Sequence, residues 1–146
     1  MKIIKTKKVK TPERNGKNAG IDLFVPSNFG VYRLYPGKQI KIPSGIRIKV
    51  PKGYCLIGFN KSGVSSKHGL IIGACVVDEN YTGEIHIHLF NISKEIATIK
   101  SNQKIIQFVV LKPNYVEIEE IKNEYDIFKE EDHLERGDGS FGSTGE

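Results

Sequence analysis

Strict alternation of apolar and charged residues constrains this chain more than any other feature of its sequence. The alternation occurs in four short segments, at residues 39–42, 46–50, 84–89 and 115–119. A period of two, carried largely by isoleucine and valine, is typical of half-buried β-strands. Turns rich in proline, serine and glycine separate the segments at short intervals, as in antiparallel folds. We therefore expect an all-β fold, a jelly-roll-like sandwich or barrel, with one short helix at residues 64–69 that Gly69 ends.

Composition excludes several other classes of protein. With 146 residues, 38% of them hydrophobic and 27% charged, the chain has the length and balance of one globular domain. No apolar stretch approaches the roughly 20 residues of a membrane span, and the first residues lack the apolar region of a secretory signal. The two cysteines, Cys55 and Cys75, form no CxxC pair, which argues against a zinc finger or a disulfide scaffold. We expect no membrane partner and a cytoplasmic location, or a host cell interior if the chain is viral.

The charge is divided unevenly along the chain. Residues 1–115 hold 19 Lys and Arg against 6 Asp and Glu, whereas residues 116–146 hold 3 against 11. We therefore expect a β core domain at 1–115, an acidic connecting segment at 116–135 and a glycine-rich C-terminal arm at 136–146. A basic body attracts polyanions, but abundant lysine also simply keeps a surface soluble, and charge does not decide between the two. The aromatic residues are not interleaved with the lysines as a stacking platform requires, so we expect no nucleic-acid partner.

Polar residues placed beside glycine mark the candidate binding segments of the core. Asp22 lies within an apolar run, and Lys61 and Ser62 precede Gly63 in a short loop. Such residues bind phosphate or metal, or they are ordinary caps and turns. Asp78 directly follows an apolar run and opens a turn. Burial there would raise the pKa of its carboxyl group and suit it to deprotonate a water, although a turn aspartate that caps its own hairpin fits the same position.

The C-terminal arm has a composition of its own. It carries an arginine, an aromatic residue and two adjacent hydroxyl residues, all spaced by glycine: Arg136, Phe141, Gly142, Ser143 and Thr144. Exposed N–H groups and hydroxyls form anion nests, and arginine adds a bidentate clamp for phosphate. A frayed terminus is the plainer interpretation of the same residues.

Taken in order, five segments of this chain resemble the five ordered motifs of the trimeric deoxyuridine triphosphatases (dUTPases). They are residues 19–23, 61–65, 73–84, 102–107 and 136–145. Each segment alone carries little information, but five in the family's order form a specific pattern. The resemblance implies a jelly-roll-like homotrimer with active sites at its subunit interfaces. It also implies hydrolysis of dUTP to dUMP and pyrophosphate with Mg²⁺.

The resemblance also assigns roles to the core residues. Asp78 would be the base that activates a water for attack on the α-phosphate, and Tyr81 would lie under the deoxyribose. The backbone from Gly73 to Val77 would read the uracil edge. Asp22 would hold waters of the magnesium shell, which fits the way Mg²⁺ binds few carboxylates.

The phosphate chain and the base would be held by the remaining motif residues. Lys61, Ser62 and Gly63 would hold the α- and β-phosphates, and Gln103 would contact the phosphate chain. In the arm, Arg136, Ser143 and Thr144 would clamp the γ-phosphate, while Phe141, beside Gly142, would stack on the uracil. A mobile arm that orders over substrate would exclude water and complete the site.

The chain departs from the family pattern at four positions. Lys61 replaces an arginine and loses its bidentate fork. Asn80 replaces an acid, Thr82 replaces an arginine, and Ser140 replaces a glycine. None of the four substitutions removes a catalytic role.

Two alternative functions and one alternative site stay open at this point. A dCTP deaminase of the same fold would need a glutamate base near the pyrimidine, for which Glu79 is the candidate. A non-catalytic, nucleotide-sensing regulatory protein would keep the fold without the reaction. His86 and His88 share one face of their strand and either line a solvent-filled channel or bind a metal on a threefold axis.

Overall fold

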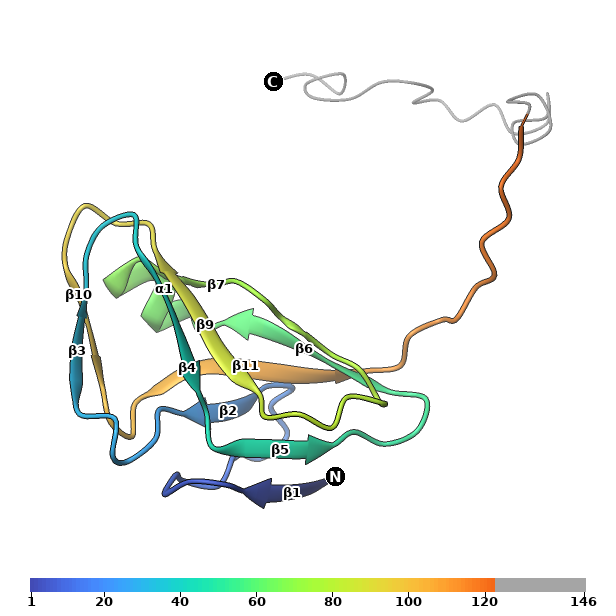
Figure 1. The fold of residues 1–146 in the computed structure, drawn as a ribbon, viewed down its shortest axis with the longest axis horizontal. Helices are drawn as coiled ribbons and strands as arrows, with labels where there is room; N and C mark the ends of the chain where they lie inside the picture. Colours follow the sequence, from blue (N-terminus) through green and yellow to red (C-terminus); the bar gives the residue numbers. More distant parts are fainter. Residues whose placement is uncertain (123–146) are drawn as a thin grey trace. The chain divides into compact units, whose positions relative to one another are not determined.

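The computed structural model describes residues 1–122, and in them strands greatly outnumber helices (Figure 1). The elements are β1 (Lys2–Lys5), β2 (Ile21–Phe24), β3 (Val31–Leu34), β4 (Gln39–Pro43), β5 (Ile46–Lys49), β6 (Cys55–Asn60), α1 (Ser62–His68), β7 (Leu70–Ile72), β8 (Val76–Val77), β9 (His86–Asn91), β10 (Ala97–Lys100) and β11 (Lys104–Leu111). The all-β expectation is confirmed.

Two larger sheets and two strand pairs form the body, and every pairing between their strands is antiparallel. The larger sheets have the strand orders β2-β11-β6-β8 and β4-β9-β7, and the pairs are β1-β5 and β3-β10. Neighbours in a sheet are therefore distant in the sequence, because the chain repeatedly crosses from one sheet to another. Such crossing is the jelly-roll type of connection.

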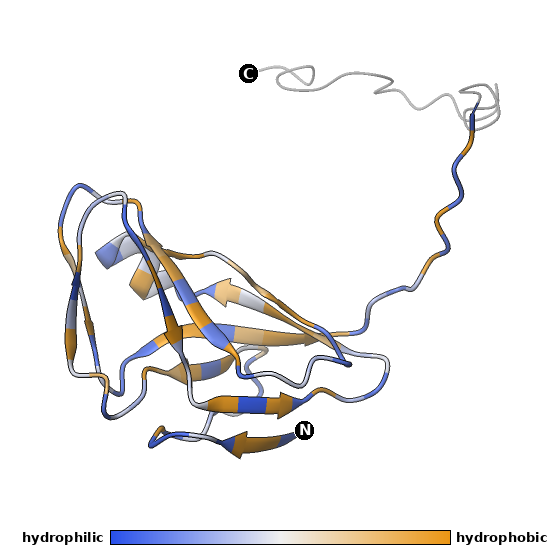
Figure 2. Cartoon of the chain, viewed as in Figure 1, coloured by the Kyte–Doolittle hydropathy of each residue, from blue (hydrophilic) through white to orange (hydrophobic). Residues whose placement is uncertain are grey.

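The core lies between the sheets, on the strand faces that carry the apolar residues. Figure 2 shows apolar and polar residues taking turns along β5, where Ile46 and Ile48 are buried and Arg47 is exposed. Fully buried side chains come from both larger sheets: Leu23, Leu56, Ile105 and Ile106 from one, and Ile42, Leu70, Ile87 and Leu89 from the other. The alternation seen in the sequence therefore corresponds to the two faces of real strands.

The short helix expected at residues 64–69 is present as α1. It runs from Ser62 to His68, and Gly69 ends it in the left-handed conformation with φ 60°. Only glycine adopts this conformation without a steric penalty. No helix among residues 1–122 is long and apolar enough to span a membrane.

The fourth alternating segment does not form the strand that its pattern predicts. Residues 115–119 belong to no helix or strand, and the side chains of Val116 and Ile118 are 70% and 96% exposed. The compact body ends at Pro113, and Asn114–Glu146 form a second unit. The predicted arm, residues 136–146, lies outside the described residues, as does most of the acidic connecting segment.

Candidate functional site

Asp22 lies at the centre of a small network of ion pairs. Its Oδ1 is 2.5 Å from Lys61 Nζ, its Oδ2 is 3.7 Å from Lys104 Nζ, and Lys104 also pairs with Glu13. We call these four residues the Asp22 cluster. The hydrogen bond to Glu13 is the main reason that the pKa of Lys104 is raised, and the charge of Asp22 adds to it. The side chains of Asp22 and Lys61 are 20% and 25% exposed, so a ligand can reach both.

The sheet register brings these residues together. Strand β11 lies between β2 and β6, and Gln107 is opposite Asp22 on one side and Phe59 on the other. Gln107 Nε2 donates to the Asn60 carbonyl at 2.9 Å. Gly20 makes room for it, because a Cβ at Gly20 would overlap the Gln107 carboxamide. Gln107 is therefore a polar side chain fixed between the Asp22 cluster and the end of β6.

Gln103, which the fourth motif was expected to contribute, does not join this group. Its Oε1 accepts a hydrogen bond from the Lys100 N–H at 3.0 Å, and its carbonyl accepts one from Val25 N–H at 3.0 Å. Both contacts hold the turn between β10 and β11. Gln107 occupies the place beside Asp22 instead, and the sequence did carry a signal for it: an amide within the apolar run of β11.

Lys61 and Ser62 stand where β6 passes into α1. Lys61 is the residue before the helix, with an extended backbone, and Ser62 and Gly63 are exposed in its first turn. The structure thus brings Lys61 to Asp22 and leaves Ser62 and Gly63 open beside it.

The second group of predicted residues lies in the long loop of the β7–β9 hairpin. Strand β8 lies within this loop but pairs with β6, where Val77 is opposite Leu56. Asp78 follows at once and closes a tight turn, because its carbonyl accepts from the Tyr81 N–H at 3.2 Å. The burial expected for Asp78 is not observed: its side chain is exposed.

Three contacts hold this loop against the rest of the body. Glu79 accepts a hydrogen bond from the Gly53 N–H, and Arg47 Nε donates to the Thr82 carbonyl at 2.7 Å. The buried Ile85 donates to the Ile46 carbonyl at 2.9 Å. The Glu79 carboxylate is thus already engaged in holding the loop.

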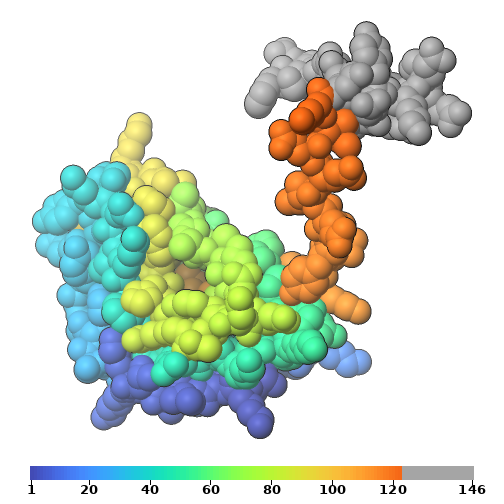
Figure 3. All heavy atoms as spheres, turned by 45° about the vertical axis from the view of Figure 1, so that its right-hand side comes forward, coloured from blue at the N-terminus to red at the C-terminus, as the bar shows by residue number. Residues whose placement is uncertain are grey.

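A cavity of about 280 Å³ opens beside the loop. Figure 3 shows a hollow in this face, between segments from the middle of the chain and with β11 at its floor. Its lining consists of Ala74, Cys75, Val76, Val77, Tyr81, Ile85, His86 and Phe108. Most of the wall is apolar, with backbone groups of 74–77 and the Tyr81 ring at hand, which suits a flat and partly polar ring.

His88 holds the beginning of the loop. Its Nδ1 accepts a hydrogen bond from the Ala74 N–H at 3.1 Å, so its Nε2 carries the proton and donates to Gln39 Oε1 at 2.6 Å. Its carbonyl accepts from the Gly73 N–H at 2.9 Å. Burial, together with the nearby charge of Lys41, lowers the pKa of His88.

Both histidines of β9 already have polar partners within the described residues. His86 Nδ1 is 3.0 Å from the Glu84 carbonyl, and both ring nitrogens of His88 are engaged. Among residues 1–122, no group of three or more His, Cys, Asp or Glu side chains lies together as metal ligands.

The two groups of predicted residues lie at opposite ends of β6. By continuation of the register, Asp78 stands opposite Cys55 at the beginning of the strand, whereas Lys61 follows its end. At about 3.3 Å per residue, the strand separates them by roughly 20 Å. Figure 1 shows α1 directly after the end of β6, away from its beginning. One chain therefore carries two separate groups of candidate residues, which we call the Asp22 half-site, with Lys61, Ser62 and Gln107, and the Asp78 half-site, with Tyr81 and the cavity.

A β-sandwich with an exposed carboxylate beside a ring-sized cavity, and with two reachable lysines at the other end of the same strand, is suited to binding an anionic nucleotide. Comparison with known proteins makes the class specific. The family model for dUTPase matches residues 6–145, and this chain therefore belongs to the dUTPase family.

Individual relatives agree with the family match. The chain is 34% identical to the mouse deoxyuridine 5'-triphosphate nucleotidohydrolase over 131 residues, which cover 90% of this chain and 75% of that protein. It is 31% identical to the protein of the same name from Fusobacterium nucleatum, over 99% of this chain and 96% of the relative. Among solved structures, the G164S mutant of the dUTPase of Staphylococcus bacteriophage 80alpha, with dUpNHpp, superposes with a TM-score of 0.78 at 26% identity, covering 99% and 98% of the two chains.

Proposed function

We propose that this protein hydrolyses dUTP to dUMP and pyrophosphate, at sites that each combine the Asp78 half-site of one copy with the Asp22 half-site of another. The family supports the reaction. The observation that carries the arrangement is the separation of roughly 20 Å between the two half-sites along β6, which is too long for one chain to apply both to one α-phosphate.

In the Asp78 half-site, the exposed carboxylate takes a proton from a water, and the resulting hydroxide attacks the α-phosphorus. The bond from that phosphorus to the bridging oxygen breaks, and pyrophosphate leaves with the electron pair. A positioned base contributes roughly 10²–10⁴-fold to such a step. Tyr81 lies under the deoxyribose, and the backbone from Gly73 to Val77 reads the uracil edge. Asp78 needs no burial for this role, because the closing arm of the proposed oligomer would exclude water.

In the Asp22 half-site, Lys61 and Ser62 hold the α- and β-phosphates, with Gly63 allowing close approach. Gln107, rather than Gln103, is the amide in reach of the phosphate chain. Asp22 would hold a Mg²⁺ ion through water once a triphosphate draws Lys61 and Lys104 away from its carboxylate, which is 20% exposed. When bound, Mg²⁺ neutralises charge on the phosphates.

The proposed assembly is a homotrimer, in which a C-terminal arm from a neighbouring copy closes the site. The alternating segment at 115–119 supports exchange between copies, because Val116 and Ile118 are left exposed in a pattern that suits a strand with an apolar partner. In the arm, Arg136, Ser143 and Thr144 would clamp the γ-phosphate and Phe141, beside Gly142, would stack on uracil. These arm residues lie outside the described part of the chain. The proposed location is the cytoplasm or a host cell interior, where deoxynucleotides are made.

Pyrophosphate release from dUTP, dTTP, dCTP and UTP, with Mg²⁺ and with EDTA, tests the reaction. We expect turnover of dUTP alone, with loss of turnover in EDTA and in Asp78→Asn. Ammonia release from dCTP would instead indicate a deaminase, and absence of turnover with every nucleotide would indicate a binding protein.

Complementation between two inactive variants tests the shared site. Asp78→Asn and Ser62→Ala each disable one half-site, so each variant alone should have little activity. When the two are co-expressed and mix randomly, about a quarter of the sites combine an intact Asp78 with an intact Ser62. Recovery of a comparable share of wild-type activity is the expected result. A co-expressed pair no more active than the two separate variants would place both half-sites in one chain.

A further inference from the structure

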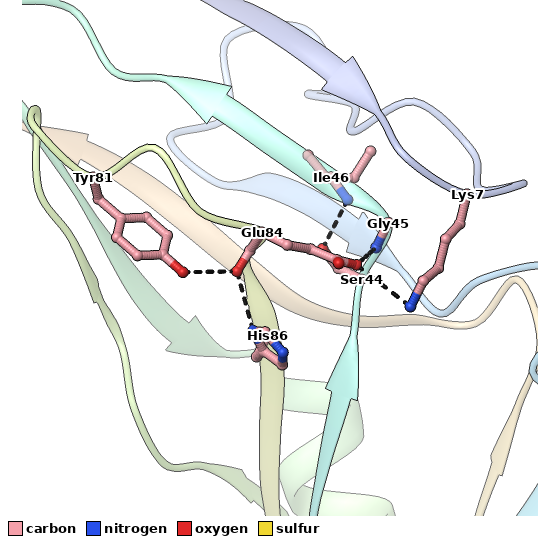
Figure 4. A network of polar contacts seen from close by, with 7 residues as sticks. All are labelled: Lys7, Ser44, Gly45, Ile46, Tyr81, Glu84 and His86. Carbon is pink, nitrogen blue, oxygen red and sulfur yellow. Dashed lines mark hydrogen bonds and ion pairs between the residues drawn. The ribbon is translucent and has the colours of Figure 1, made fainter.

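The carboxylate of Glu84 ties together three segments that are far apart in the sequence (Figure 4). Its Oε1 accepts a hydrogen bond from the Gly45 N–H at 2.6 Å and lies 3.6 Å from Lys7 Nζ. The turn that presents this N–H is held by a hydrogen bond of its own, in which the buried Ser44 hydroxyl accepts from the Ile46 N–H at 3.1 Å. The N-terminal segment is held there as well, by a 2.8 Å bond from the Thr6 N–H to the Gly45 carbonyl. Residue 84 is thus anchored through its side chain.

The main chain of the same residue holds the ring of Tyr81. The Tyr81 hydroxyl donates to the Glu84 carbonyl at 2.9 Å, and His86 Nδ1, at 3.0 Å, donates to the same oxygen. A carbonyl oxygen has two lone pairs, and here both are in use (Figure 4). Gly83 lets the ring lie close, because a Cβ at this position would overlap the Tyr81 hydroxyl.

Tyr81 depends on these contacts more than a buried ring would. Its side chain is 42% exposed, and exposed side chains change rotamer on a picosecond-to-nanosecond timescale unless something holds them. In the proposed function, the Tyr81 ring lies under the deoxyribose and leaves no room for a ribose 2′-hydroxyl. Such steric rejection requires that the ring does not move aside for the larger nucleotide. We propose that Glu84 is a positioning residue for Tyr81, and that the Lys7–Glu84–Gly45 anchor thereby sets how strongly the site rejects the ribose 2′-hydroxyl. This role rests on the proposed function, in which Tyr81 lies under the sugar.

The remaining anchors of the loop do not need the Glu84 carboxylate. Glu79 holds Gly53, Arg47 holds the Thr82 carbonyl, and Ile85 pairs with the main chain of β5. Removing the carboxylate should therefore leave the loop folded and loosen only the 81–84 portion that carries the ring.

The test compares three variants of the full chain with a matched control. Glu84→Ala removes the anchor, Glu84→Gln keeps an acceptor for Gly45 but loses the charge that faces Lys7, and Gly83→Ala displaces the ring without touching the anchor. The control, Ser101→Ala, removes a hydrogen bond of the same kind elsewhere, from the Gly30 N–H to a side-chain oxygen at 2.7 Å. For each chain, kcat/KM is measured with dUTP and UTP, together with the thermal midpoint.

We expect the ratio of kcat/KM for dUTP to that for UTP to fall about tenfold in Glu84→Ala, the size of effect that losing a charge-assisted hydrogen bond produces. The ratio should also fall in Gly83→Ala, because the added methyl group displaces the Tyr81 ring. Glu84→Gln should restore most of the ratio, and Ser101→Ala should leave it unchanged at a similar loss of thermal midpoint. A ratio that stays constant in Glu84→Ala overturns the proposal, whether or not Gly83→Ala lowers it.

A second readout separates this proposal from the proposed function. In the chain labelled with 3-fluorotyrosine, the Tyr81 resonance, assigned with Tyr81→Phe, should shift or broaden in Glu84→Ala and remain in place in Ser101→Ala. An unmoved resonance rejects positioning by Glu84 even in a fully active enzyme. If the resonance moves while the wild-type chain hydrolyses no dUTP, the proposed function fails and with it the role in sugar selection, whereas the mechanical link between Glu84 and Tyr81 stands.

Discussion

The two ends of β6 present contrasting ways of preparing charged groups for a ligand. Beyond its end, the Asp22 cluster is a closed network, in which Asp22 is shared by Lys61 and Lys104 and every charge has a partner. At its beginning, Asp78 is an exposed carboxylate on a loop that Gly53 holds through the Glu79 side chain and that Arg47 and Ile46 hold through its backbone.

This contrast indicates that the Asp22 half-site can rearrange when a ligand binds, whereas the Asp78 half-site is already in place. An ion pair that stays partly open to solvent can exchange partners, because a phosphate offers a lysine the same kind of charge-assisted contact as a carboxylate does. In the proposed function, the Asp22 cluster would therefore release its lysines to the phosphates when a nucleotide binds. Asp78 has no ion pair to exchange among the described contacts, so the geometry of its loop must already be correct before the substrate binds.

Asp78→Asn gives the largest effect that this comparison predicts. Because Asp78 is exposed and contributes to no ion pair among the described contacts, the variant should lose about 10³-fold or more in kcat with an unchanged thermal midpoint. Pyrophosphate release and a melting curve measure the two quantities. A clear loss of stability in the variant would contradict the division of labour between the two ends of β6.

Asp22→Asn should have the next largest effect and act on the metal rather than the base. Removal of a carboxylate that holds a hydrated metal typically costs 10–100-fold in affinity, so the Mg²⁺ concentration for half-maximal activity should rise by about that factor. Glu13→Gln serves as the control, because it loosens Lys104 and leaves the Asp22 carboxylate in place. An equal Mg²⁺ requirement in both variants would show that Asp22 acts only as a partner of lysine.

Lys61→Arg sharpens the comparison by changing how the Asp22 cluster grips phosphate. A guanidinium can pair bidentately with a phosphate, which an ammonium cannot. We expect KM for dUTP to fall about threefold with little change in kcat, measured by initial rates under saturating Mg²⁺. A higher KM would mean that the guanidinium group stays paired with Asp22 and does not bind the phosphates of the substrate.

The smallest expected effect is a dependence of stability on pH that originates at His88. The pKa of this histidine is lowered in the folded chain from 6.5, so the unfolded chain binds the proton more readily. The contribution of His88 is complete above about pH 6.5 and is lost as the pH falls through the lowered pKa. Protonation would oppose the Ala74 N–H at Nδ1 and face Lys41 across the β4–β9 pair.

Denaturant titrations of the wild type and His88→Gln between pH 7.5 and 5 measure this effect. The free energy of unfolding should decline less steeply in the variant. His86→Gln is the matched control, because it removes a histidine two positions away and leaves the contacts of His88 with Ala74 and Gln39 in place. Identical slopes in all three chains would remove His88 as the cause.

Local sequence was sufficient for the elements of the core. The alternation at residues 39–42 and 46–50 became β4 and β5, and Gly69 ended the helix where its conformational freedom predicted. These features depend on residues a few positions apart, and such relations are written in the sequence directly. The ordered motifs likewise sufficed for the family, because each is a short segment whose residue types do not depend on the fold around it.

The tertiary structure alone decided which residues meet. The register of β11 against β2 places Gln107 opposite Asp22. Gln103 lies in the turn before β11, and its side chain accepts a hydrogen bond from Lys100 instead. The pairing of β8 with β6 left Asp78 exposed and separated it from Lys61 by the length of a strand. Residues 115–119 have the alternation of a strand but belong to no strand. Register and strand partners arise from contacts between distant segments, or between copies of the chain, and no local pattern specifies them.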